Sequence, residues 1–139
     1  MTTIETKHQT ADSSAEKLFA FLSDMNNYEH LMPEGKIENW KSEEDHCEFT
    51  IKGMAKIGME IQETVKPNLI KINSFGKVPF PFDLNIHINP ISDQSSELFM
   101  VFNGDINMFM KMMVEKPLTN FFNMLVDKGA NLNLSAGSA

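Results

Sequence analysis

Hydrophobic and polar residues alternate with a period of two over much of the chain, which predicts a series of β-strands. The first alternating segment, Thr3 to Thr10, places Ile4, Thr6 and His8 on one side. We expect six further strands, over residues 37–41, 47–52, 56–66, 69–74, 82–89 and 98–107. The connections between these six segments are short, which antiparallel hairpins allow and parallel crossovers do not. The pattern therefore predicts a meandering antiparallel sheet of seven strands.

Two short helices are predicted between the first and second strands. Ser13 and Glu16 fit a capping box at the start of an apolar helix that runs to about Leu22. Asp24 suits the N-cap of a second short helix, which ends before the turn that begins at Pro33.

The longest helical segment, Met108 to Leu132, follows the last strand and is rich in methionine and phenylalanine. A proline in a helix interior costs roughly 3 kcal/mol, so we expect a kink or a break at Pro117. The only apolar surface available to this helix is the sheet, which is therefore expected to curve around it. We expect one domain over residues 1–132 and a disordered tail from Asn133 to Ala139.

Composition and charge narrow the classes of function. A chain of 139 residues is long enough for one domain with a substantial core. Its formal net charge of −7 opposes binding to nucleic acid or to an anionic membrane. All 12 basic residues are lysines, so arginine cannot bind a phosphate or carboxylate in a bidentate manner. This absence argues against nucleotides and acyl-CoA as preferred ligands.

Other features indicate the cellular setting. No apolar run is long enough to span a bilayer, and the first residues lack the apolar core of a signal peptide. The single cysteine, Cys47, excludes an internal disulfide and is typical of an inert buried side chain. We expect a cytoplasmic protein without integral membrane association, either a monomer or a homodimer.

The predicted order of elements is a strand, two short helices, six antiparallel strands and a long helix. This order resembles the START-like helix-grip superfamily, also called SRPBCC, over residues 3–132. Two local patterns carry the resemblance: Ser13 to Asp24 looks like the first helix of bacterial members, and Asn27 to Pro33 looks like the segment that follows it. The superfamily includes polyketide cyclases, birch-pollen-allergen-like proteins and lipid-transfer domains. The glycine-rich loop of its plant members is absent, since Ser42 to Asp45 joins the second and third strands.

The resemblance implies an α+β helix-grip fold with a hydrophobic cavity between the curved sheet and the C-terminal helix. Methionine adapts to ligands of varied shape, although the same side chains could equally fill the core. Phe80, between two prolines, is either a lid over the cavity or a residue packed onto the sheet. The candidate ligand-binding residues are Tyr28, Trp40, Met59, Ile61, Glu63, Phe80, Phe82, Ile86, Met100, Met112, Met113, Phe121 and Leu125.

Two polar residues share predicted strand faces with apolar residues of the core. Glu63 shares its predicted face with Met59 and Ile61, although a solvated position near the strand end is the interpretation we favour for it. His8 shares a face with Ile4. Both are weak candidates for a catalytic acid or base. The four histidines are scattered, without the spacing of a zinc site, and no nucleophile motif occurs. We expect no metal site and no cofactor.

Three functions are compatible with these features of the sequence. The first, which we prefer, is storage, transport or sensing of a small hydrophobic ligand such as a lipid, an isoprenoid or a polyketide. The second is a cyclase- or dehydratase-type enzyme that acts on a hydrophobic substrate in the same cavity. The third is a protein-interaction module, in which Phe80 and the Met-rich segment bind a partner or a second copy.

Overall fold

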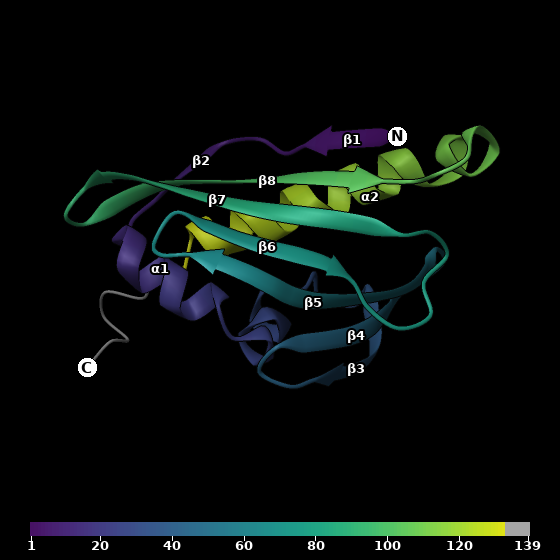
Figure 1. Ribbon diagram of the computed structural model, residues 1–139, viewed down its shortest axis with the longest axis horizontal. Helices are drawn as coiled ribbons and strands as arrows, with labels where there is room; N and C mark the ends of the chain where they lie inside the picture. Colours follow the sequence, from purple (N-terminus) through teal and green to yellow (C-terminus); the bar gives the residue numbers. More distant parts are fainter. Residues whose placement is uncertain (133–139) are drawn as a thin grey trace.

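The computed structural model describes residues 1–132, which form a curved antiparallel sheet, two short helices and a long C-terminal helix (Figure 1). This architecture confirms the expected fold class. The expected tail lies outside the described residues. The strands are β1 Thr2–Glu5, β2 Gln9–Ala11, β3 Ile37–Ser42, β4 His46–Ile51, β5 Ala55–Val65, β6 Leu69–Ser74, β7 Phe82–Ser92 and β8 Ser95–Gly104. The helices are α1 Ala15–Leu22, the 3-10 helix η1 Met25–Leu31 and α2 Met108–Ala130.

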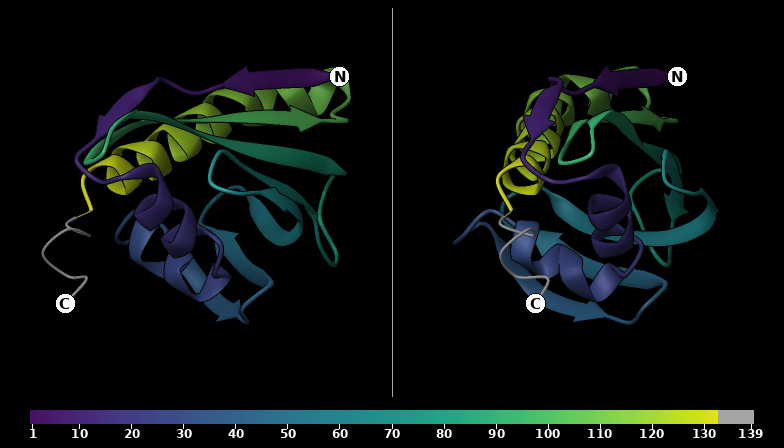
Figure 2. Two further views of the ribbon diagram at one scale, coloured as in Figure 1. Left: turned by 60° about the vertical axis from the view of Figure 1, so that its left-hand side comes forward. Right: turned by 90° about the vertical axis from the view of Figure 1, so that its left-hand side faces the viewer.

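The strand order is β1-β8-β7-β6-β5-β4-β3, and β2 also pairs with β8. Strands β3 to β8 are neighbours in sequence order because their connections are too short for crossovers. The sheet bends strongly, and α2 lies against its inner face (Figure 2). Helix α1 contacts β6 and β7, while η1 contacts β3, β4 and α2. No helix within residues 1–132 is long and apolar enough to cross a membrane.

The sheet has eight strands, not the expected seven, because the first predicted strand is divided. Glu5 pairs with Val101 and Gln9 with Leu98, so the N-terminal segment has one residue more than β8 between these pairs. Thr6 interacts with Met100 at this point: its backbone N–H donates to the Met100 carbonyl, and its Oγ1 accepts from the Met100 N–H, both at 2.9 Å. The extra residue changes which side chains face inward after Thr6.

The two short helices form where the sequence predicts them, with one correction. The N-cap of α1 is Ser14, not Ser13: Ser14 Oγ accepts from the backbone N–H of Lys17 at 3.2 Å. Ser13 is buried, and its carbonyl accepts from Ser96 Oγ of β8 at 2.9 Å. This contact joins the start of α1 to the sheet.

The cap of η1 is Asp24, as expected, because its Oδ1 accepts from the Asn26 N–H at 2.9 Å.

Helix α2 is continuous through Pro117, so the expectation of a break is wrong. Asn107 caps the helix and accepts from the Met110 N–H at 2.8 Å. Near the other end, Gly129 allows close packing on β8, since a Cβ at Gly129 would lie 2.9 Å from Leu98 Cδ2. The side chains of α2 that are buried against the sheet are Val114, Leu118, Phe121, Phe122, Leu125, Val126 and Ala130.

Candidate ligand-binding groove

A groove of about 520 Å³ lies between α2, the turn that joins β4 to β5, and the segment before β3. Small-molecule sites typically have volumes of roughly 300–1,000 Å³, so the groove is large enough for such a ligand. Its walls come from three separate parts of the chain. The lining residues are Pro33, Gly35, Lys36, Ile51, Lys52, Gly53, Met54, Met113, Lys116, Pro117, Asn120, Phe121 and Met124.

The floor of the groove is apolar. Phe121, Ile51 and Pro33 are buried, and Met54 and Met124 are half-buried. A ligand with an apolar body would therefore cover side chains that belong to the core.

One face of α2 forms the long wall. The lining residues from Met113 to Met124 recur at intervals of three and four, which places their side chains on the same side of a helix. On this face Lys116 and Asn120 are exposed, and Phe121 reaches inward. The rim of this wall therefore carries the polar groups of Lys116 and Asn120 beside exposed Met113 and Pro117, with buried Phe121 below them.

The opposite wall is formed by two tight turns that are joined by a backbone hydrogen bond. Gly35 and Gly53 both have positive φ values, 78° and 77°, which glycine adopts without steric cost. The N–H of Lys52 donates to the carbonyl of Lys36 at 3.0 Å. This bond keeps the two turns side by side and brings their lysines to the same rim.

The rim of the groove carries positive charge, and no acidic side chain lines the groove. Lys36, Lys52 and Lys116 are exposed, and no aspartate, glutamate or histidine lines the groove. Within residues 1–132, ion pairs form at other lysines, such as Lys7 with Asp127 and Lys56 with Glu48, but at none of the three rim lysines. Their ammonium groups are therefore available to a ligand.

No protein-family profile matches this chain. No curated protein matches it. Solved structures do match: a truncated norcoclaurine synthase from Thalictrum flavum aligns with a TM-score of 0.71 at 16% identity, covering 93% of this chain and 91% of that one. The same enzyme in complex with dopamine and hydroxybenzaldehyde aligns with a TM-score of 0.68 at 16% identity, covering 93% and 84%. A protein from Thermus thermophilus aligns with a TM-score of 0.76 at 10% identity, covering 99% and 100%.

The chain has a helix-grip fold. The curved antiparallel sheet and the long C-terminal helix match those of the norcoclaurine synthase structures. At identities this low the likeness shows the architecture alone, and the chemistry of the site depends on the residues of this chain.

Within the helix-grip fold, the residues predicted to bind ligand fall into separate groups. Met113 and Phe121 line the groove. Trp40 and Ile61 are half-buried at the edge of the core. Core residues and groove residues are both apolar, which is why the sequence pattern does not separate them. The predicted residues that are buried in the core are Tyr28, Met59, Phe80, Phe82, Ile86, Met100 and Leu125.

The space between the sheet and α2 contains closely packed aromatic rings. Phe102 lies at the centre, with its ring centroid 5.2 Å from that of Phe122 and 5.3 Å from that of Phe82. Phe80 packs edge-on against Phe102 at 6.3 Å and is buried, so it is a packing residue and not a lid. Tyr28 is fully buried, and its hydroxyl donates to the Leu22 carbonyl at 2.8 Å.

Met112 was expected to line the cavity between the sheet and α2. Its side chain is instead 84% exposed and does not face the sheet. Met108 and Phe109 are also largely exposed. The start of α2 extends past the end of β8 (Figure 1), which leaves these side chains without an inner sheet face to cover.

Glu63 is exposed and does not lie on the inner face. Ile61 pairs with Ile72 and Glu63 with Lys71, so β5 contains one extra residue at this point. The alternation that places Met59 inward therefore no longer applies at Glu63.

His8 is exposed too, and the expectation that it faces inward is wrong. Its Nε2 lies 2.7 Å from Glu5 and its Nδ1 lies 3.2 Å from Glu97. The His8 ring stacks on Phe99 with a centroid distance of 3.8 Å, and His87 stacks on Phe99 at 4.7 Å.

The pKa values of these two imidazoles are shifted in opposite directions. The hydrogen bond to Glu5 raises the pKa of His8, whereas burial lowers the pKa of His87. Hydrogen bonds from Asn89 and His8 lower the pKa of Glu97.

The one cysteine is inert, as the sequence suggests. Cys47 is fully buried beside Met25, and burial raises the pKa of its thiol to about 12. A thiol with this pKa is protonated at neutral pH and is a poor nucleophile.

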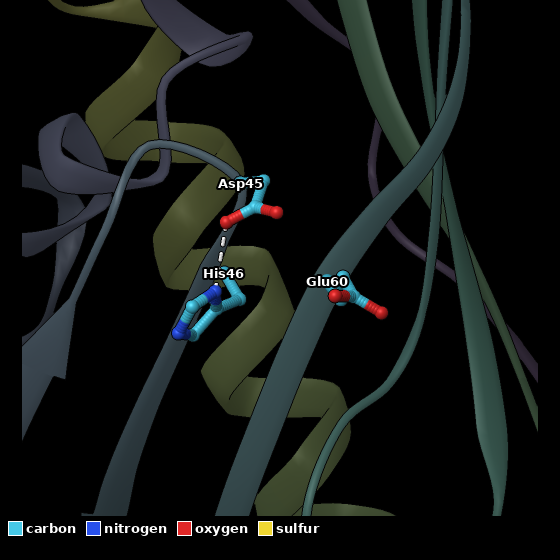
Figure 3. Close-up of side chains that lie close together, drawn as sticks. All are labelled: Asp45, His46 and Glu60. Atoms are coloured by element: carbon cyan, nitrogen blue, oxygen red, sulfur yellow. Dashed lines mark hydrogen bonds and ion pairs between the residues drawn. The ribbon is translucent and has the colours of Figure 1, made fainter.

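A second cluster of polar side chains lies at the start of β4, beside β5, where Figure 3 shows Asp45, His46 and Glu60 close together. Their possible ligand atoms all lie within 4.8 Å of one another, and the set contains ligand types that zinc accepts. His46 pairs across the strands with Glu60, a proximity that spacing along the chain does not reveal. Asp45 is 67% exposed and lies 2.8 Å from His46 Nδ1, and Glu60 accepts from Gln62. Each of the three side chains therefore has a polar partner among the described residues.

Proposed function

We propose that this protein binds a small molecule with an apolar body in the groove between α2 and the β4–β5 turn. The observation that supports this proposal is the groove itself, with its apolar floor and its open, polar rim. Apolar area removed from water contributes about 25 cal/mol per Å², so covering the floor supplies the affinity. Lipids, isoprenoids and polyketides all have the required apolar body.

The comparisons support a small-molecule ligand in a limited way. A norcoclaurine synthase structure is a complex with dopamine and hydroxybenzaldehyde, both small molecules. We propose that this chain uses the same architecture to hold a different small molecule, since its groove is built from its own turns and lysines.

Storage, transport or sensing fits the groove better than the cyclase or dehydratase alternative. General acid–base chemistry requires a suitable group within hydrogen-bond reach of the substrate. No carboxylate or imidazole lines the groove, and His8 and Glu63 are exposed on other parts of the molecule. We therefore expect Glu63→Gln and His8→Ala to leave ligand binding unchanged.

A groove-filling substitution tests the proposal. Asn120→Trp adds a large side chain at an exposed helical position on the groove wall, so it should block the groove without disturbing the core. We expect the affinity for the neutral fluorescent probe N-phenyl-1-naphthylamine to fall by about tenfold or more, with an unchanged melting temperature. The measurement is a fluorescence titration, compared by Kd.

The matched control is Lys71→Trp, which places the same side chain at an exposed position of β6 that does not line the groove. This variant should bind the probe as the wild type does. Equal probe affinities for the wild type and Asn120→Trp would contradict the proposal.

A further inference from the structure

We propose that the groove selects ligands that carry a negatively charged group, a carboxylate or a phosphate, on an apolar body. This inference rests on the proposed binding function and adds the chemical class of the ligand. It is carried by the arrangement of Lys36, Lys52 and Lys116 above the apolar floor.

The three lysines converge from separate parts of the chain. Lys36 and Lys52 are joined through their backbones at 3.0 Å, and Lys116 belongs to the facing wall of α2. An anionic group at the mouth of the groove therefore meets ammonium donors from both walls. Asn120, one helical turn after Lys116, adds an amide group to the same rim.

The charge of the whole chain makes this rim distinctive. The formal net charge is −7, so the average surface repels anions. A groove lined by charge of one sign concentrates the local potential and attracts ligands of the opposite sign. The groove has three lysines and no acid in its lining. Its local charge is therefore positive, whereas the net charge of the chain is negative.

The apolar floor strengthens the effect of these charges. Phe121 and Ile51 displace water from one side of the site, and an ion pair is stronger where the surrounding dielectric constant is lower. Lysine acts as a point charge without the planar geometry of arginine. We therefore expect the site to require a negative charge and to tolerate different shapes of the anionic group.

The test uses four probes with the same alkyl chain: dodecanoate, dodecyl phosphate, dodecanol and dodecyltrimethylammonium, each below its micelle concentration. Binding to the full chain is followed by NMR of 13C-labelled methionine methyl groups. Met54 and Met124 report on the groove, Met59 and Met100 on the core, and Met108 and Met113 on side chains that are more than half exposed. The groove signals therefore separate specific binding from adhesion elsewhere.

We expect dodecanoate or dodecyl phosphate to bind at least about tenfold more tightly than dodecanol. Dodecyltrimethylammonium should bind most weakly. The combined variant Lys36→Gln, Lys52→Gln and Lys116→Gln should lose the preference for anions and bind the anionic probes about as weakly as it binds dodecanol. Added salt should weaken only the anionic probes, because it screens the lysines. The ratio between the two anionic probes identifies the preferred acid group.

The control variant Lys71→Gln removes a lysine outside the groove lining and should keep the preference for anions. Equal binding of dodecanol and the anionic probes to the wild type, or a preference that survives in the triple variant, would overturn this inference and leave the proposed function standing. If none of the four probes shifts the signals of Met54 and Met124, the proposed function fails together with the inference.

Discussion

At the scale of single residues, Phe99 is covered on its two faces by imidazoles with opposite pKa shifts. His8 gains a hydrogen bond to Glu5, which raises its pKa above the usual 6.5, and His87 is half-buried, which lowers its pKa below that value. Charged His8 therefore stabilises the fold below about pH 6.5, and this contribution is lost as the pH rises through its folded pKa. Neutral His87 contributes above pH 6.5, and its contribution is lost as the pH falls through its folded pKa.

We expect an NMR pH titration of the imidazole Cε1–H signals to show His8 titrating above 6.5 and His87 below it. Glu5→Gln should move the His8 titration to lower pH, because it replaces the carboxylate that bonds to Nε2. A His8 that titrates at lower pH than His87 would show that the hydrogen bond to Glu5 or the burial of His87 is absent in solution.

His8 and Glu63 both lie off the inner face of the sheet, and the physical cause is the same for both. Each follows a one-residue register shift, the first between Glu5 and Gln9 and the second between Ile61 and Glu63. A shift of one residue moves every later side chain to the other face of a strand. Alternation in one sequence shows no such shift, because the hydrogen bonds that cause it involve a distant strand, as Thr6 does with Met100.

At the scale of secondary-structure elements, strand periodicity predicted most of the sheet because the six central hairpin-linked segments alternate clearly. The groove was harder to predict. Its floor uses the same apolar residue types as the core, and its rim consists of lysines that resemble any solvated lysine. The floor and rim residues form one site only because the turns at Gly35 and Gly53 lie side by side and face the part of α2 around Lys116.

The pairing of β5 with β6 depends on a glycine. A Cβ at Gly58 would lie 1.9 Å from the carbonyl oxygen of Phe75, whose N–H donates to the Gly58 carbonyl at 2.9 Å. We expect Gly58→Ala to lower the free energy of unfolding by about 3 kcal/mol, the upper end for overpacking, because the end of β6 has to move. Urea unfolding measures the change.

The control in the same strand is Lys56→Ala, at an exposed position with one surface ion pair to Glu48. It should change the free energy of unfolding by less than about 1 kcal/mol. If Gly58→Ala is as mild as this control, the close backbone approach at Phe75 does not exist.

At the scale of the whole molecule, an exposed apolar patch stands apart from the core. We define it as Met108, Phe109, Met112 and Met113 on the first turns of α2, all more than half exposed. Patches of this kind commonly mark contact surfaces, and it is the part of the molecule on which the interaction hypothesis depends.

We expect the double variant Phe109→Ser and Met112→Ser to keep the free energy of unfolding within about 0.5 kcal/mol of the wild type, since exposed side chains contribute little. It should also elute earlier from a hydrophobic-interaction column. Phe122→Ser, on the buried face of the same helix, should instead cost about 3–5 kcal/mol. A large loss of stability in the double variant would show that the patch is covered in solution.

The continuity of α2 through Pro117 has a consequence for the hydration of the groove. Proline has no N–H, so the carbonyl of Met113, four residues earlier, lacks its helical donor. Both residues line the groove, and a polar group without a partner is costly unless water or another donor reaches it. The wall of α2 therefore contains one hydrogen-bond acceptor that solvent must satisfy when the groove is empty. A ligand has either to leave that water in place or to supply a donor of its own.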